Sequence, residues 1–128
     1  MKRFSLIVLI FLTLVASAPS VQAQLLSPYP YCFTITNKAN WTVYGDVESK
    51  PYTSPNGTLT HHRSNFRLES GDKTRVCTSG PFYDGYRMRF VLRTLIPIFE
   101  CYTLANRDVT ITGRQISPTE SETKATCY

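Results

Sequence analysis

The sequence predicts an all-β protein: a small antiparallel β-sandwich or open barrel of about seven strands, stapled by two disulfides. Three observations lead to this prediction: short runs of alternating apolar and polar residues, turn signals between them, and an even number of cysteines. After the first segment, no stretch has the 3.6-residue period of an amphipathic helix. These features favour packed layers of strands over a helical or mixed architecture.

Seven runs alternate as half-buried strands do. In chain order they cover residues 31–36, 41–48, 66–68, 73–77, 86–93, 98–103 and 109–112. A short break at 37–40 separates the first two runs, and turn chemistry at 69–72 separates the next two, so each pair is predicted to form a hairpin. Residues 49–65 contain two prolines and a glycine without an apolar period, which predicts a long loop.

The start of the chain has the organisation of an export signal. Lys2-Arg3 precedes an apolar run over residues 4–16, and Val21-Gln22-Ala23 places small residues at the positions that a signal peptidase reads. The apolar run is shorter than the roughly 20 residues of a membrane-spanning helix. We therefore expect 1–23 to be a signal peptide and 24–128 a single mature domain, periplasmic or extracellular, without a transmembrane segment after cleavage.

The four cysteines, Cys32, Cys77, Cys101 and Cys127, all follow the expected cleavage site, and an even number in an exported chain indicates disulfides. Three pairings are possible, and spacing does not choose among them. We favour Cys32–Cys77 with Cys101–Cys127, because the polar C-terminal tail 116–128 would fray without an anchor. Zinc is disfavoured because no two cysteines have the spacing of a ligand pair. No metal or cofactor is expected.

Basic residues are concentrated in the centre of the chain. Alternation puts three arginines on one side of the run 86–93, and two more lie on neighbouring runs. These five candidate anion-binding residues are Arg87, Arg89, Arg93, Arg67 and Arg75. Arginine clusters bind carboxylate and phosphate groups bidentately, so an anionic glycan, a lipid headgroup or an acidic protein would suit this face. The alternative is a charged face that only keeps the domain soluble; no nucleic acid is expected.

Residues that could carry catalysis are few. His61 and His62 are the two histidines of the chain, and neighbours in a strand point to opposite faces, so both do not easily serve one site. Asp46 and Glu48 lie on one face of their run, as a pair of hydrolase carboxylates would, although exposed acids commonly serve solvation. Nucleophile elbows, phosphate loops and Cys-x-x-Cys redox pairs are absent from the sequence. We assign no catalytic residue.

Asn40-Trp41-Thr42 and Asn56-Gly57-Thr58 match the N-glycosylation pattern. Asn40 and Asn56 would be modified only if the host exports the protein through a eukaryotic secretory pathway. The signal segment is typical of bacteria, which favours a periplasm.

Two resemblances extend this interpretation. The strings Asn65–Gly71, Cys77–Tyr83, Val91–Pro97 and Thr126–Tyr128 are similar to small exported proteobacterial proteins of unknown function, over nearly the whole mature chain. Phe33–Asn37 followed by Trp41–Tyr44 resembles the opening of thaumatin-like β-sandwiches, which are much longer and richer in cysteine. The resemblances imply export, paired cysteines and a sandwich, and they imply no activity.

We therefore predict a non-enzymatic exported binding module with a basic sheet face. Two alternatives stay open: a small hydrolase or metal-binding protein that uses His61 or His62, and a structural or inhibitor-like stapled domain.

Overall fold

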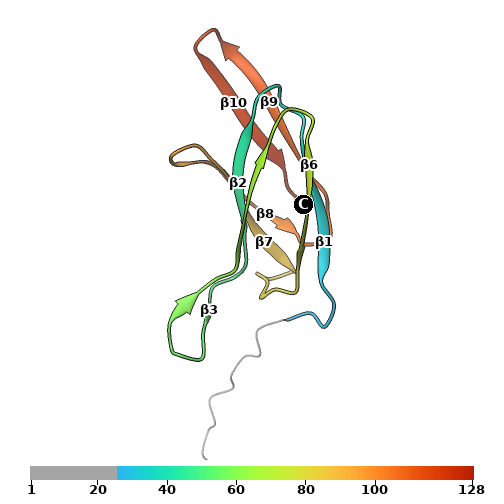
Figure 1. Ribbon diagram of the computed structural model, residues 1–128, viewed down its shortest axis with the longest axis vertical. Coiled ribbons are helices and arrows are strands. Elements are labelled where there is room, and N and C mark those ends of the chain that lie inside the picture. The colour runs from blue at the N-terminus through green and yellow to red at the C-terminus, as the bar shows by residue number, and fades with distance from the viewer. Residues whose placement is uncertain (1–25) are drawn as a thin grey trace, which may run out of the picture.

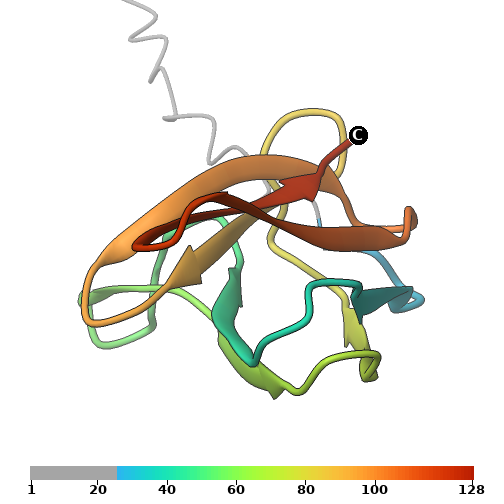
Figure 2. The ribbon, with the colours of Figure 1, turned by 90° about the horizontal axis from the view of Figure 1, so that it is seen from above.

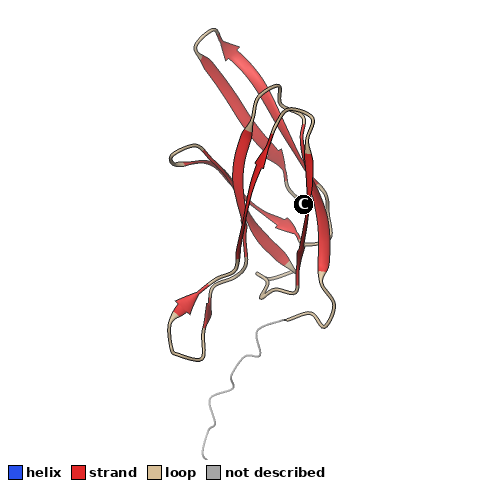
Figure 3. Ribbon diagram, viewed as in Figure 1, coloured by secondary structure: helices blue, strands red, loops and turns tan. Residues whose placement is uncertain are grey.

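The computed structural model describes residues 26–128, which form an all-β structure without a helix (Figure 3). Eight strands make two four-stranded sheets that are not closed into a barrel. Sheet A has the order β10 (Glu120–Thr126), β9 (Val109–Ser117), β1 (Tyr31–Asn37) and β6 (Lys73–Thr78). Sheet B has the order β5 (Arg63–Leu68), β2 (Val43–Glu48), β7 (Arg87–Arg93) and β8 (Pro97–Leu104). The predicted all-β, disulfide-stapled architecture is confirmed.

A small ribbon, β3 (Tyr52–Thr53) with β4 (Leu59–Thr60), extends the connection between β2 and β5 beyond the sandwich (Figure 1). The predicted loop 49–65 is therefore the extended end of a β2–β5 hairpin.

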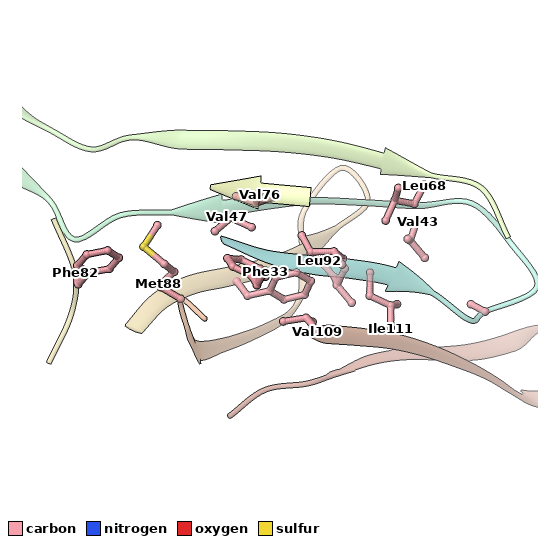
Figure 4. Packing of buried hydrophobic residues seen from close by; sticks show 14 residues of the cluster. Phe33, Val43, Val47, Leu68, Val76, Phe82, Met88, Leu92, Val109 and Ile111 are labelled. Atoms are coloured by element: carbon pink, nitrogen blue, oxygen red, sulfur yellow. The ribbon is translucent and has the colours of Figure 1, made fainter. Parts of the chain in front are cut away.

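The core lies between the two sheets. Sheet A contributes Phe33, Ile35 and Ile111, and sheet B contributes Phe90 and Leu92, all at most 2% exposed. Figure 4 shows the buried side chains of both sheets meeting in one continuous layer. Fully burying an aliphatic or aromatic side chain stabilises a fold by about 1.5–3 kcal/mol, so this layer is the main source of stability. The alternation predicted for residues 31–36 and 86–93 is confirmed by these burials.

The two predicted early hairpins are wrong. β1 and β2 lie in different sheets, and so do β5 and β6, so residues 38–42 and 69–72 cross from one layer to the other. The side chain of Asn37, which is fully buried, explains both corners: its Nδ2 donates hydrogen bonds to the carbonyl oxygens of Trp41, Leu68 and Glu69. A short polar break between two alternating runs looks the same in sequence whether the chain forms a hairpin or an arch.

Pairing is antiparallel throughout the two main sheets except between β1 and β9, which run parallel with Thr36 beside Thr110. This parallel pair lies within a sandwich that is otherwise antiparallel, as predicted. β9 reaches sheet A from the other sheet through the connection after β8, and it enters beside β1 in the same direction. Seen from above, the β8–β10 part of the chain (orange to red) lies on the opposite side from β2 and β5 (Figure 2).

Residues 116–128 are polar as predicted, but they do not form a tail. They complete β9 and form β10, which pairs with β9 over Glu120–Thr126 (Figure 1). Small inward side chains, such as Ala125, pack against the core, so a polar edge strand forms without large apolar residues.

The two disulfides are Cys32–Cys77 and Cys101–Cys127, as predicted. Cys32 and Cys77 are direct cross-strand neighbours in sheet A. Cys101 on β8 and Cys127 after β10 join sheet B to sheet A at the open side of the sandwich. The predicted signal peptide, 1–23, lies outside the described residues. Within residues 26–128, no helix has the length and apolar character that crossing a membrane requires.

Candidate binding surfaces

The outer face of sheet B carries a network of ion pairs centred on Glu48, whose side chain is 4% exposed. One of its oxygens lies 2.7 Å from Nη2 of Arg63, and the other lies 2.6 Å from Nη1 of Arg89. The register creates this arrangement, because Glu48 on β2 is directly opposite Arg63 on β5 and Arg89 on β7. The carboxylate is thus enclosed by guanidinium groups from both neighbouring strands.

The network continues across β7 to β8. Arg89 donates two hydrogen bonds to Glu100, of 2.9 Å from Nε and 2.7 Å from Nη2. Arg93 contacts Asp46 through Nε and lies 3.8 Å from Glu48. We call this set the charge ladder: Arg63, Arg89, Arg93, Asp46, Glu48 and Glu100. Three arginines face three carboxylates, so its formal charge is zero.

The pKa shifts in the charge ladder follow from these contacts. Burial opposes ionisation of Glu48, but the hydrogen bond from Arg89 and the charges of Arg63 and Arg89 outweigh it and hold the pKa of that carboxyl below its ordinary value. The hydrogen bond from Arg89 also lowers the pKa of Glu100. The same contacts raise the pKa of Arg89. The carboxyls of Glu48 and Glu100 are therefore ionised near neutral pH.

The structure does not bring the five candidate arginines to one surface. Arg89 and Arg93 belong to the charge ladder, and Arg87 donates hydrogen bonds to the backbone oxygens of Tyr102, at 3.4 Å, and Tyr128. Arg67 is bridged to Glu69 at 3.2 Å. Arg75 lies on β6 in the other sheet. The predicted cationic stripe is therefore an internally neutralised network along most of its length.

The outer face of sheet A has a different composition. Because Phe33 and Ile35 point into the core, the alternate residues of β1 point outward. The register places Thr126, Thr110, Thr36 and Lys73 side by side across the four strands. In the neighbouring rows, Thr34 is beside Arg75, Thr112 is beside Lys124, and Arg114 is beside Glu122. We call this surface the threonine face: Thr34, Thr36, Thr110, Thr112 and Thr126, with Lys73, Arg75, Arg114 and Lys124.

Positive charge on the threonine face is only partly neutralised. Lys73 and Arg75 are exposed, and within residues 26–128 no carboxylate lies within ion-pair distance of either. On the opposite edge, one carboxylate, that of Glu122, is shared by Lys124 at 3.0 Å and Arg114 at 3.7 Å. A second acid nearby, Asp108, accepts a 2.7 Å hydrogen bond from the backbone nitrogen of Thr34.

The sequence contains a repeated tripeptide that indicates this face, although the face was not predicted. Thr34-Ile35-Thr36 and Thr110-Ile111-Thr112 are two copies of one tripeptide, with a buried isoleucine between two outward threonines. The signal has meaning only once β1 and β9 are known to be parallel neighbours, because the register then places Thr36 of the first copy beside Thr110 of the second.

The sandwich also opens at two clefts. The larger, about 500 Å³, lies between the β9–β10 hairpin of sheet A and the facing end of sheet B, and its lining includes Trp41, Val43, Leu92, Ile98 and Ile116. Trp41 packs so closely on Gly113 that a Cβ there would lie 2.3 Å from the indole ring. The smaller cleft, about 370 Å³, lies between β5 and β6 and includes His62 and Met88.

The histidines do not form a metal or catalytic cluster. His61 and His62 are both exposed, and Nε2 of His62 lies 3.1 Å from the hydroxyl of Tyr52. Residues 26–128 contain no group of three histidine, cysteine or acidic side chains placed to hold a metal ion. Asp46 and Glu48 share a strand face as predicted, but both are paired with arginines. Asn40 and Asn56 are exposed.

No protein-family model and no curated protein matches the chain. Among solved structures, a protein described as "Trapped Toxin" is similar with a TM-score of 0.43 and 10% sequence identity, over 78% of this chain and 24% of that chain. The chain thus spans about a quarter of that protein's length. A likeness at this level bears on neither family nor function.

Proposed function

We propose that this protein is an exported binding module for an anionic partner, and that the threonine face of sheet A is its binding surface. Two disulfides support export, because such bonds persist in oxidising compartments. We retain the basic sheet face expected from the sequence, but we assign it to sheet A instead of sheet B.

The observation that carries the proposal is the contrast between the two sheets. The arginines of the charge ladder are neutralised by acids on adjacent strands. Lys73 and Arg75 have no such partner within the described part of the chain, although they are cross-strand neighbours of outward threonines. Cations that the fold leaves unpaired are available to a ligand, whereas those of the ladder would first have to break buried ion pairs.

Sheet geometry makes this surface well defined. Lys73 and Arg75 are alternate residues of one strand, so their side chains leave the same face about 6.6 Å apart along it. The Cys32–Cys77 disulfide joins β1 to β6 beside Arg75 and fixes the two strands laterally. A rigid surface loses little conformational freedom on binding.

The test compares two double variants that remove the same charge. Lys73→Ala with Arg75→Ala removes the unpaired cations of the threonine face, and Lys50→Ala with Arg67→Ala removes two exposed cations elsewhere. Binding of immobilised dextran sulfate, with neutral dextran as the reference surface, is measured at low salt. We expect the first variant to bind about tenfold more weakly and the second to bind nearly as wild type does.

Binding should also weaken as salt rises, because the Debye length falls from about 10 Å at 0.1 M to about 3 Å at 1 M. Equal losses in the two variants would show that only net charge matters and would overturn the assignment of the surface. Wild-type protein that binds no polyanion at low salt would overturn the proposed function itself.

A further inference from the structure

We propose that the Cys32–Cys77 disulfide is a site of thiol–disulfide exchange, at which a dithiol reductant opens the bond on the outer face of sheet A and two unpaired cations attract the attacking thiolate. The Cys101–Cys127 disulfide is the structural bond of the pair. This inference goes beyond the proposed function, because it assigns a reaction to one bond and does not depend on an anionic partner.

The position of the bond in sheet A is the first step. Cys32 on β1 and Cys77 on β6 lie directly opposite each other in the register. Their neighbours in sequence, Phe33 and Val76, are buried in the core, so the two sulfur atoms lie on the outward face. Cys77 is exposed there, and Cys32 is half-buried. Because β6 is also an edge strand of its sheet, a reductant can reach the bond without separating the strands.

The contrast with the other disulfide is the second step. Cys101 and Cys127 are both half-buried, and both pack against the core where they join the two sheets. Exchange begins when a thiolate reaches one sulfur of the bond, so its rate depends on access. Exposed disulfides are the labile ones, whereas those that pack against a core are protected. A reductant should therefore distinguish the two bonds of the folded protein.

The charge around the exposed bond is the third step. Lys73 and Arg75 leave the same face of β6 as Cys77, and in the part of the chain that the structure describes neither has a carboxylate within ion-pair distance. The nearby acid is Asp108, which lies on the β9 side of Thr34 and accepts a hydrogen bond from its backbone nitrogen. Two cations and one acid leave a local positive charge. This charge attracts an incoming thiolate and stabilises the thiolate that is released.

The exchange proceeds in two displacements. A thiolate of the reductant attacks Sγ of Cys77 and forms a mixed disulfide, and the Cys32 sulfur leaves as a thiolate that takes a proton from water. The second thiolate of the reductant then attacks its own sulfur in the mixed disulfide and releases Cys77, which is protonated in turn. Two electrons pass to the protein, which gains two thiols while the reductant becomes a disulfide. β6 stays in the sheet, because its register with β1 and the burial of Val76 do not require the bond.

The test reduces the folded, oxidised protein with dithiothreitol and follows each bond separately. Samples are quenched with acid and alkylated, and the labelled cysteines are mapped by peptide mass spectrometry. We expect the Cys32–Cys77 bond to open at least about tenfold faster than the Cys101–Cys127 bond, with the circular dichroism spectrum still native. Its rate should rise in proportion to the dithiothreitol concentration, as direct attack requires. Equal rates for the two bonds, or a rate that levels off at the rate of unfolding, would overturn the proposal.

A second measurement tests the cations with an anionic thiol, mercaptoethanesulfonate, at low salt. We expect Lys73→Ala with Arg75→Ala to slow the opening of the Cys32–Cys77 bond several-fold, because the attraction of the thiolate is lost. The matched control, Lys50→Ala with Arg67→Ala, should react as wild type does. Equal slowing in the two variants, or slowing in neither, would overturn the role of the cations. Dextran sulfate binding by wild-type protein is measured independently, so failure of the exchange reaction and failure of the proposed function are distinguishable.

Discussion

The side-chain nitrogen of Asn37 lies 3.1 Å from the carbonyl oxygen of Leu68, and this hydrogen bond joins the end of β1 in sheet A to the end of β5 in sheet B. The same amide donates to Trp41 at 2.8 Å, and its Oδ1 accepts from the backbone nitrogen of Ala39 at 2.9 Å. One buried residue thus satisfies the backbone at both corners where the chain changes sheet.

Replacing Asn37 by alanine should destabilise the sandwich strongly. The change leaves several buried backbone groups without partners, each costing about 1–3 kcal/mol, so we expect the free energy of unfolding to fall by about 3 kcal/mol or more. Urea denaturation with the disulfides intact measures it, and Asn56→Ala on the exposed ribbon loop is the control. A loss below about 1 kcal/mol would contradict the role given to Asn37.

Replacing Glu48 by glutamine should show the cost of breaking the charge ladder. Arg63 and Arg89 would lose their shared carboxylate, and because both guanidinium groups remain partly exposed we expect the loss of a charged hydrogen bond, about 1.5–3 kcal/mol. Glu69→Gln is the matched control, since Glu69 pairs with Arg67 where both side chains are more than half exposed. Nearly equal losses for the two variants, measured by denaturant unfolding, would show that the ladder behaves like ordinary surface charge.

Stability should fall in acid because of Glu48 and Glu100. Their pKa values lie below the ordinary 4.5, so the folded state binds fewer protons than the unfolded state as pH falls through this region. This contribution is complete above pH 4.5 and is lost as pH drops through the folded pKa values. A Glu48→Gln, Glu100→Gln variant should have a smaller decrease in unfolding free energy between pH 5 and pH 2. An unchanged pH profile would contradict the account.

Removing the Cys101–Cys127 bond should loosen the open side of the sandwich. With both cysteines changed to serine, β10 loses its covalent link to sheet B and keeps its pairing with β9 and the packing of Ala125, so we expect faster amide exchange in Glu120–Thr126 and little change in β1 and β7. Hydrogen–deuterium exchange resolved by peptide measures this. The variant with Cys32 and Cys77 changed to serine is the control, and equally fast exchange of β10 in both would contradict the prediction.

The parts of the fold that depend on local alternation could be predicted from the sequence. Phe33 and Ile35 alternate with threonines, and Phe90 and Leu92 alternate with Arg89, Val91 and Arg93, so their burial followed from the strand period. The disulfide pairing was also predicted, with the fraying argument as its reason.

Long-range pairing could not be predicted in the same way. The break after Asn37 reads as a hairpin turn, because the groups that make it a corner, the carbonyls of Leu68 and Glu69, come from a distant part of the chain. Likewise, the sequence does not show that Arg89 is neutralised, because its acidic partners reach it only when β2 and β8 pair with β7. The face that we propose for binding therefore differs from the face that the sequence predicted.

We expect an anionic ligand to meet sheet A and not the charge ladder. Titrating isotope-labelled protein with dextran sulfate fragments, and following backbone amide resonances, tests it directly. We predict that the largest shifts occur at Thr34, Thr36, Lys73, Arg75 and Thr110, with Arg63 and Arg89 nearly unmoved. Shifts concentrated at Arg63, Arg67 and Arg89, or no shifts at saturating ligand, would contradict the account.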